Sequence, residues 1–190
     1  MIAIQKSQYI TPQEYLEWGT KQPTKYEYID GQIIAMTGGT IPHNEIAVNL
    51  TTALKNHLRG RSCKVLMADA KVEISEQEPF YYLDVMVSCD ERDKKAIKMI
   101  KYACLIIQVL SPGTEAFDRR KKIQSYRRIS TLKEYILVSA DQIMFECFRL
   151  NEKGVWELYS YLEGDNFEFK SVNFGSPIDL IYEDVFLGEL

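Results

Sequence analysis

The stretch that most constrains the fold is residues 103–110, ACLIIQVL, in which seven apolar side chains surround one polar side chain, Gln108. An almost continuous apolar run of this length is typical of a strand in the centre of a sheet. A highly charged segment with a helical pattern follows at 114–128, and another apolar strand follows at 134–139. This order predicts a mixed α/β domain that contains a strand–helix–strand unit.

The N-terminal region carries clear signals for a helix and a hairpin. The sequence TPQE at 11–14 is a capping box with proline at the first helical position, so it predicts a short helix that ends at Gly19. Two alternating runs, 26–29 and 32–36, flank the dipeptide Asp-Gly at 30–31. Asp-Gly between two such runs predicts a tight β-hairpin.

The middle of the chain predicts one more helix and two strands. Apolar residues at four-residue steps predict an amphipathic helix over 43–58, which Gly60 closes. Segments 63–74 and 81–89 each have the pattern of one strand, and the charged segment 90–101 predicts a loop or a short helix. The rest of the chain, with FECFRL, VWELYSYL and NFEFKSV, predicts an antiparallel meander. With no linker, repeat or low-complexity segment, we expect residues 1–190 to form a single domain.

Composition narrows the class of protein. The net charge of −4 argues against a uniformly basic nucleic-acid-binding surface but allows a local basic site. The four cysteines are scattered without a CxxC pair, which favours buried thiols in a reducing compartment over disulfides or a zinc site, and we expect a cytoplasmic protein. No signal peptide and no membrane span is predicted. With two histidines, any metal would be a hard ion held by carboxylates, such as Mg²⁺ or Mn²⁺.

Basic residues cluster in two places in this acidic chain, within 92–101 and within 119–128. The simpler interpretation of both clusters is a solvated surface. The functional interpretation is a surface that follows nucleic-acid phosphates, because Lys and Arg dominate affinity for nucleic acids. The candidate DNA-binding residues in the second cluster are Arg119, Arg120, Lys121 and Arg127.

Three polar residues interrupt apolar strands: Glu27, Asp84 and Gln108. A carboxylate in such a strand is costly unless it is exposed, paired or bound to a metal. Each of the three is, taken alone, more simply explained by structure than by catalysis. Together with Lys122 on the following helix they form a less common combination. Asp118, Lys122 and Tyr126 are four residues apart and therefore share one helix face, which an ion pair alone could also explain.

These residues lie in motifs that resemble the Uma2 family of restriction-endonuclease-like proteins, within the PD-(D/E)XK nuclease superfamily and abundant in cyanobacteria. The resemblance covers nearly the whole chain. The motifs that carry it are TPQEYLEW, KYEYIDGQIIAMTGG followed by HN, YYLDVMVSCD, VLSPGTEAFDRRKKIQSYRRI, LKEYILVS and PIDLIYEDV.

The resemblance implies a restriction-endonuclease-like fold, with a mixed central sheet flanked by helices and additional antiparallel strands at the C-terminal end. It also implies a metal-dependent phosphodiesterase site of Glu27, Asp84, Gln108 and Lys122, in which the first three hold Mg²⁺ or Mn²⁺. Two carboxylates would hold the ion, and the ammonium group would orient water or neutralise charge on the phosphate. Asp118, Tyr126 and Lys71 are expected to support these residues.

The chain departs from the family pattern at two positions. Leu83 replaces a proline that contributes no ligand, whereas Gln108 replaces an acidic residue, so metal affinity should fall. The resulting hypothesis is a metal-dependent endonuclease that hydrolyses DNA, weakened by Gln108, and expected to act as a homodimer. The alternative is a catalytically inactive module with a nuclease fold that binds nucleic acid or a protein partner.

Overall fold

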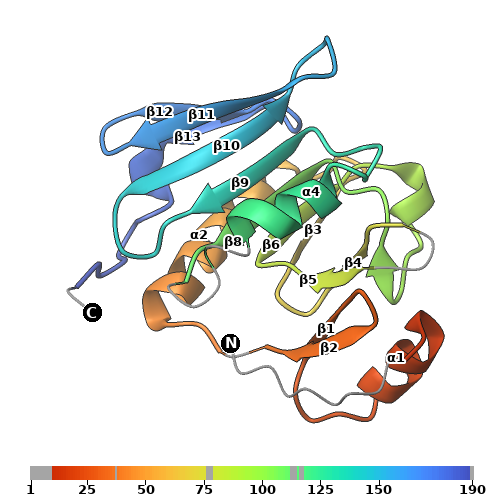
Figure 1. Ribbon diagram of the computed structural model, residues 1–190. Helices are drawn as coiled ribbons and strands as arrows, with labels where there is room; N and C mark the ends of the chain where they lie inside the picture. The colour runs from red at the N-terminus through yellow and green to blue at the C-terminus, as the bar shows by residue number, and fades with distance from the viewer. Residues whose placement is uncertain (1–9, 37, 76–78, 112–114, 116–117, 189–190) are drawn as a thin grey trace.

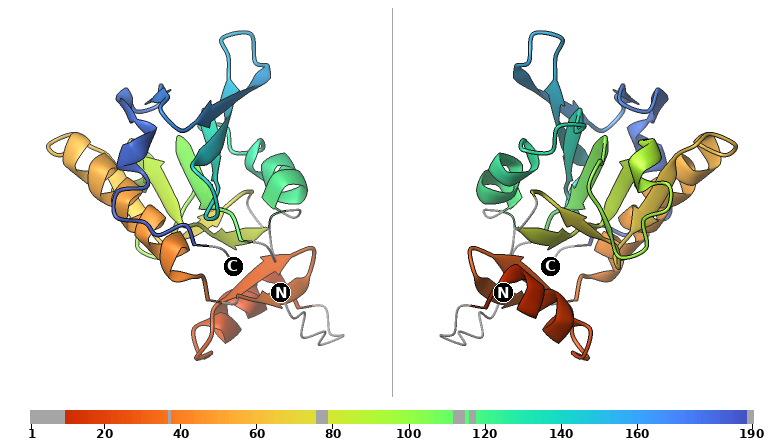
Figure 2. Two further views of the ribbon diagram at one scale, coloured as in Figure 1. Left: turned by 90° about the vertical axis from the view of Figure 1, so that its left-hand side faces the viewer. Right: turned by 90° about the vertical axis from the view of Figure 1, so that its right-hand side faces the viewer.

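The computed structural model describes residues 10–36, 38–75, 79–111, 115 and 118–188. Within this part of the chain, a six-stranded mixed sheet and a five-stranded sheet form the framework, with a separate two-stranded hairpin near the C-terminal end (Figure 1). Helix α2 and helix α4 lie on opposite sides of the six-stranded sheet (Figure 2). The predicted α/β fold, with a mixed central sheet flanked by helices, is confirmed.

The six-stranded sheet has the strand order β11-β10-β9-β8-β6-β3. Strand β8 pairs in parallel with β9 and antiparallel with β6, so the apolar run around Gln108 is central, as predicted. The strands of this sheet, in chain order, are β3 (Lys64–Met67), β6 (Val85–Ser88), β8 (Leu105–Val109), β9 (Glu134–Val138), β10 (Met144–Leu150) and β11 (Trp156–Leu162).

The five-stranded sheet has the order β2-β1-β5-β4-β7 and contains the predicted hairpin. Asp30 and Gly31 both have positive φ, 49° and 76°, which is the backbone that a two-residue primed turn requires. The strands are β1 (Tyr26–Ile29), β2 (Gln32–Ala35), β4 (Lys71–Glu73), β5 (Phe80–Tyr82) and β7 (Met99–Ile100). Strands β12 (Asn166–Phe169) and β13 (Phe174–Pro177) pair with each other.

Two helices follow the sequence signals closely. Helix α1 (Pro12–Gly19) has both hydrogen bonds of the capping box and ends at the predicted residue. Helix α2 (Ile41–His57) begins two residues earlier than predicted, because Thr40 caps it by accepting a hydrogen bond from the His43 backbone N–H. Short 3-10 turns, η1 (Glu91–Asp93) and η3 (Ile178–Leu180), lie in the loop segments.

The predicted helix over 114–128 is described in part. Residues 112–114 and 116–117, which include most of the Ser-Pro-Gly turn, lie outside the described residues. A π-helical turn, η2 (Asp118–Lys122), leads into α4 (Ile123–Tyr126). π-helical turns inside helices occur frequently at functional sites.

The alternation of β8 decides which side chains face which helix. Leu105, Ile107 and Val109 pack in the core that contains buried residues of α2. Ile106 packs in the opposite core, with Ile123 of α4. Gln108 has the same parity as Ile106, so it lies on the side of the sheet that carries η2 and α4.

Two single-strand predictions are wrong, because each segment divides between the two sheets. Segment 63–74 forms β3 and β4, separated by a turn in which Ala68 has a φ of 52°. Segment 81–89 forms parts of β5 and β6, with Leu83 and Asp84 between them. The Ala68 N–H donates to the carbonyl oxygens of Leu83 and Asp84, and so holds the two breaks together.

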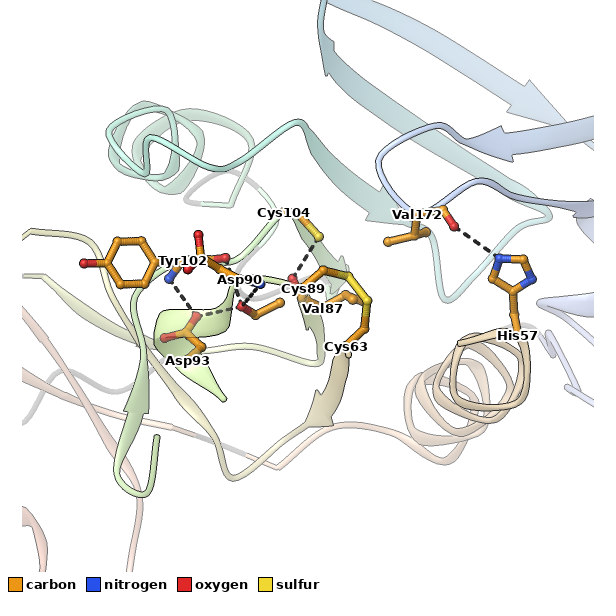
Figure 3. The surroundings of a disulfide bond; sticks show 10 residues. His57, Cys63, Val87, Cys89, Asp90, Asp93, Tyr102, Cys104 and Val172 are labelled. Atoms are coloured by element: carbon orange, nitrogen blue, oxygen red, sulfur yellow. Dashed lines mark hydrogen bonds between the residues drawn. A yellow bond between two sulfur atoms is a disulfide. The ribbon is translucent and has the colours of Figure 1, made fainter. Parts of the chain in front are cut away.

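The expectation of unpaired cysteines is also wrong for two of the four. Cys63 and Cys89 form a disulfide between the ends of β3 and β6 (Figure 3). The pairing of Lys64 with Ser88 places the two cysteines opposite each other at the next position of the ladder. Cys104 and Cys147 are free thiols.

Candidate active site

Four separate elements contribute the predicted catalytic residues to one pocket. Glu27 comes from β1, Asp84 from the break between β5 and β6, Gln108 from β8, and Lys122 from η2. All four line a cavity of about 470 Å³. The structure therefore brings together side chains that are up to 95 positions apart in the chain (122 − 27 = 95).

Lys122 is buried between two carboxylates. Its Nζ lies 3.1 Å from Glu27 Oε1 and 3.1 Å from Asp118 Oδ1. Burial lowers the pKa of Lys122, but the two carboxylates together outweigh this effect and raise that pKa above its ordinary value. Lys122 is thus a fixed cation at neutral pH, suited to stabilising negative charge and unsuited to acting as a base.

Glu27 is almost completely buried and is held from two sides. Its Oε1 accepts a hydrogen bond from the Tyr82 N–H at 3.3 Å, in addition to its ion pair with Lys122. Burial raises the pKa of Glu27, and Lys122 opposes that rise. These contacts make Glu27 a residue that positions Lys122.

Asp84 and Gln108 contact each other directly. Gln108 Nε2 donates to Asp84 Oδ2 at 2.8 Å, and the Val109 N–H donates to the same oxygen at 2.8 Å. Burial raises the pKa of Asp84, against the opposing effects of His43, the Val109 N–H and Lys122. Gln108 Oε1 is buried and has no hydrogen-bond partner among the described residues.

His43 is a member of the site that the sequence did not predict. His43 lies in the first turn of α2, lines the same cavity, and places its Nε2 3.5 Å from Asp84 Oδ1. The only available sequence signal was the HN pair after the two glycines in the family-like motif. A single histidine in a helix does not by itself predict a functional role, because that role depends on the side chains that it contacts in the fold.

The three predicted supporting residues have different surroundings. Asp118 lines the cavity and pairs with Lys122. Tyr126 is fully buried beside the Tyr81 ring, with 5.4 Å between ring centroids, and burial raises its pKa well above the ordinary value. Lys71 lies in a different cavity, with its Nζ 4.6 Å from the centroid of the Tyr15 ring, so it does not line the pocket of Lys122.

The predicted DNA-binding residues do not line this cavity. Arg119 forms ion pairs with Glu115 and Glu146, so its charge is already compensated. It lines a smaller neighbouring cavity that shares Thr40 and Ser111 with the main one. Arg120, Lys121 and Arg127 are exposed. The guanidinium carbon of Arg127 lies over the Trp156 ring, 5.5 Å from the ring centroid.

The donor atoms of the pocket fit a divalent metal ion only if Gln108 takes part. Within the described residues, no group of three His, Cys, Asp or Glu side chains could hold a metal ion. Asp84 supplies a carboxylate, and Gln108 supplies a buried amide oxygen without a hydrogen-bond partner. Oxygen donors of this kind suit Mg²⁺ or Mn²⁺ that also keeps several water ligands, at a lower total charge than two carboxylates provide.

The fold defines the protein as a mixed α/β protein, and a solved structure shares that fold. A solved structure from Anabaena variabilis, described as "a putative nuclease belonging to DUF820", superposes with a TM-score of 0.77 at 16% sequence identity and covers 93% of this chain and 99% of that chain. At this identity the match concerns the fold.

The chain belongs to the Uma2 family. The family model, described as "Putative restriction endonuclease", matches residues 12–172. Two relatives from Synechocystis sp. are both named as uncharacterized proteins: slr1290, 40% identical over 91% of each chain, and sll1609, 30% identical over 90% of this chain and 97% of the relative. In the described residues, no helix is long and apolar enough to cross a membrane.

Proposed function

We propose that this protein is a metal-dependent endonuclease that hydrolyses DNA phosphodiester bonds, with metal affinity reduced by Gln108. The observation that carries the proposal is the meeting of Asp84, Gln108 and Lys122 in one pocket, with a buried amide oxygen left unpaired. Membership of the Uma2 family, whose model is described as "Putative restriction endonuclease", supports the reaction class.

Each residue has a distinct role in this proposal. Asp84 and Gln108 would hold Mg²⁺ or Mn²⁺, and such an ion would supply Lewis-acid polarisation of the scissile phosphate and activation of water. Lys122 would neutralise the charge that develops on the phosphate oxygens. Glu27 and Asp118 fix the ammonium group of Lys122 at that position through contacts of 3.1 Å.

One contact favours the second candidate function, a catalytically inactive module that binds nucleic acid or a protein partner. If residue 108 were acidic, as in the family pattern, its carboxylate and that of Asp84 would repel each other unless a cation lay between them. Here the Gln108 amide donates a hydrogen bond to Asp84 at 2.8 Å, so the pair is stable without a cation. This arrangement is what a site that has lost its metal requirement would contain.

The proposed function includes DNA as a partner. The exposed Arg120, Lys121 and Arg127 would contact DNA phosphates outside the pocket. A homodimer and a cytoplasmic location remain predictions. Cys63 and Cys89 form a disulfide, so the cysteines no longer support a reducing compartment, although Cys104 and Cys147 are free thiols.

The test is nicking of supercoiled plasmid with Mg²⁺ or Mn²⁺ by the wild type, Asp84→Asn and Gln108→Glu. The endonuclease proposal predicts slow nicking by the wild type, faster nicking by Gln108→Glu, and none by Asp84→Asn. DNA binding without nicking by all three proteins would instead support the binding module. Nicking by the wild type and Asp84→Asn at the same rate would refute the assigned site.

A further inference from the structure

His43 faces the pocket without a role in the proposed hydrolysis. Its side chain is about one-fifth exposed, and Asp84 beside it is 15% exposed, so both are reachable from the pocket although mostly covered. His43 is not buried in the apolar core, since its Nε2 faces the Asp84 carboxylate. The distance of 3.5 Å between His43 Nε2 and Asp84 Oδ1 is longer than a good hydrogen bond.

The same distance suits two ligands of one metal ion. Two donor atoms, each about 2.1 Å from an ion and separated by 90° to 109°, lie roughly 3.0 to 3.4 Å apart. The separation in this pocket is close to that range. Gln108 would supply a third donor: its Nε2 donates to the other carboxylate oxygen, Asp84 Oδ2, and its Oε1 is buried without a hydrogen-bond partner among the described residues.

The loop before α2 is shaped to hold the imidazole ring. A Cβ atom at Gly39 would lie 2.8 Å from His43 Nδ1, closer than real Cβ contacts, and 3.0 Å from Cγ, so the ring would have to shift. A Cβ atom at the neighbouring Gly38 would meet nothing within 4 Å. Glycine at position 39 therefore leaves room for the ring beside Asp84, which a larger residue would occupy.

We infer that His43 is a metal ligand through Nε2, and that His43, Asp84 and Gln108 form a mixed nitrogen and oxygen site that prefers Mn²⁺ over Mg²⁺. This inference deepens the proposed function and rests on it. Imidazole nitrogen is a better ligand for first-row transition metals than for Mg²⁺, which prefers oxygen. The imidazole nitrogen compensates for the acid that Gln108 replaces, because it supplies a strong metal donor where a carboxylate oxygen is missing.

The experiment is Mn²⁺ binding followed by electron paramagnetic resonance, on the full chain without a histidine tag. Electron spin echo envelope modulation detects a ¹⁴N nucleus bound to the ion. The affinity of the protein for Mn²⁺ comes from titration of the signal of free Mn²⁺. The chain has two histidines, so His57→Gln is a matched control. His57 lies 14 residues further along α2, or about 21 Å away along the helix, where its Nε2 contacts the Val172 carbonyl.

We expect ¹⁴N coupling in the wild type and in His57→Gln, and none in His43→Phe, which should bind Mn²⁺ at least about tenfold more weakly. Displacement of Mn²⁺ from the wild type should need more than about tenfold excess of Mg²⁺, and His43→Phe should lose most of this preference. Gly39→Ala should weaken Mn²⁺ binding while Gly38→Ala leaves it unchanged, which tests the ring position with His43 still present.

The outcomes separate this inference from the proposed function. Mn²⁺ binding without ¹⁴N coupling, or equal affinity in the wild type and His43→Phe, would overturn the role of His43 while metal-dependent nicking could still be observed. Failure of the wild type and Gln108→Glu to bind either ion would overturn both. Circular dichroism of His43→Phe and Gly39→Ala confirms that each variant is folded before its affinity is compared.

Discussion

Removal of the Lys122 charge is predicted to destabilise the protein strongly, because two buried carboxylates would lose their counter-ion. Each contact of Nζ, with Glu27 and with Asp118, is 3.1 Å long. At an effective dielectric constant of about 20, each is worth roughly 5 kcal/mol of Coulomb energy. The cost of desolvating the ammonium group cancels several kcal/mol of this sum, so Lys122→Met should lower the free energy of unfolding by about 3–5 kcal/mol.

The assay is urea denaturation at pH 7, monitored by circular dichroism. Lys121→Met is the matched control: it is the adjacent residue and is exposed, so its effect should stay within about 0.5 kcal/mol. The triple variant Lys122→Met, Glu27→Gln, Asp118→Asn leaves no charge in the cluster and should recover most of the lost stability. A loss of unfolding free energy below about 1 kcal/mol in Lys122→Met would refute the view that the Lys122 ammonium group neutralises the two buried carboxylates.

The direction in which the free energy of unfolding changes with pH follows from the shifted pKa values of Lys122 and Glu27. The pKa of Lys122 is raised in the folded state, so its stabilisation is complete below the unfolded pKa of about 10.5 and is lost as pH rises through the folded pKa. Glu27 also has a raised pKa, so the folded state binds its proton more tightly and stability rises as pH falls through that pKa. Without Lys122 this effect should grow, and Lys122→Met should gain stability between pH 7 and pH 5 relative to the wild type.

Two further predictions concern parts of the chain outside the pocket. Reduction of the Cys63–Cys89 bond, which spans 26 positions, should lower the free energy of unfolding by about 3 kcal/mol in denaturation with and without dithiothreitol; an unchanged midpoint would contradict a stabilising disulfide. Joint replacement of the exposed Arg120 and Lys121 by alanine should reduce the slope of log K for DNA binding against log salt concentration by about two phosphate contacts. Arg119→Ala should change the slope little, because Arg119 is already paired with two glutamates. Fluorescence anisotropy measures the slopes, and the reverse ranking would refute the assignment.

Local sequence signals predicted the elements that local physics determines. The capping box of α1 and the Asp30-Gly31 turn depend on the residues within each element, and both are present in the structure. The central position of β8 follows from an apolar run that must be covered on both faces. The two strand breaks near Ala68 and Asp84 were not predictable, because alternation is the same whether a strand continues or passes to another sheet.

The site was partly predictable for a similar reason. Glu27, Asp84 and Gln108 stood out because a polar side chain in an apolar strand needs an explanation. The disulfide depends on strand register, which sequence alone does not provide, and its partners were therefore missed. His43 was missed because its importance comes from Asp84, 41 positions away (84 − 43 = 41), across the pocket.

Asp84 and Gln108 are proposed to form a weakened metal site for DNA cleavage. The most direct test is the ratio of plasmid-nicking rates, Gln108→Glu over wild type, measured from limiting to saturating Mg²⁺. Because an added carboxylate improves metal affinity, we expect a ratio well above one at limiting Mg²⁺ that falls toward one at saturation. A ratio of one or less at every Mg²⁺ concentration would contradict it.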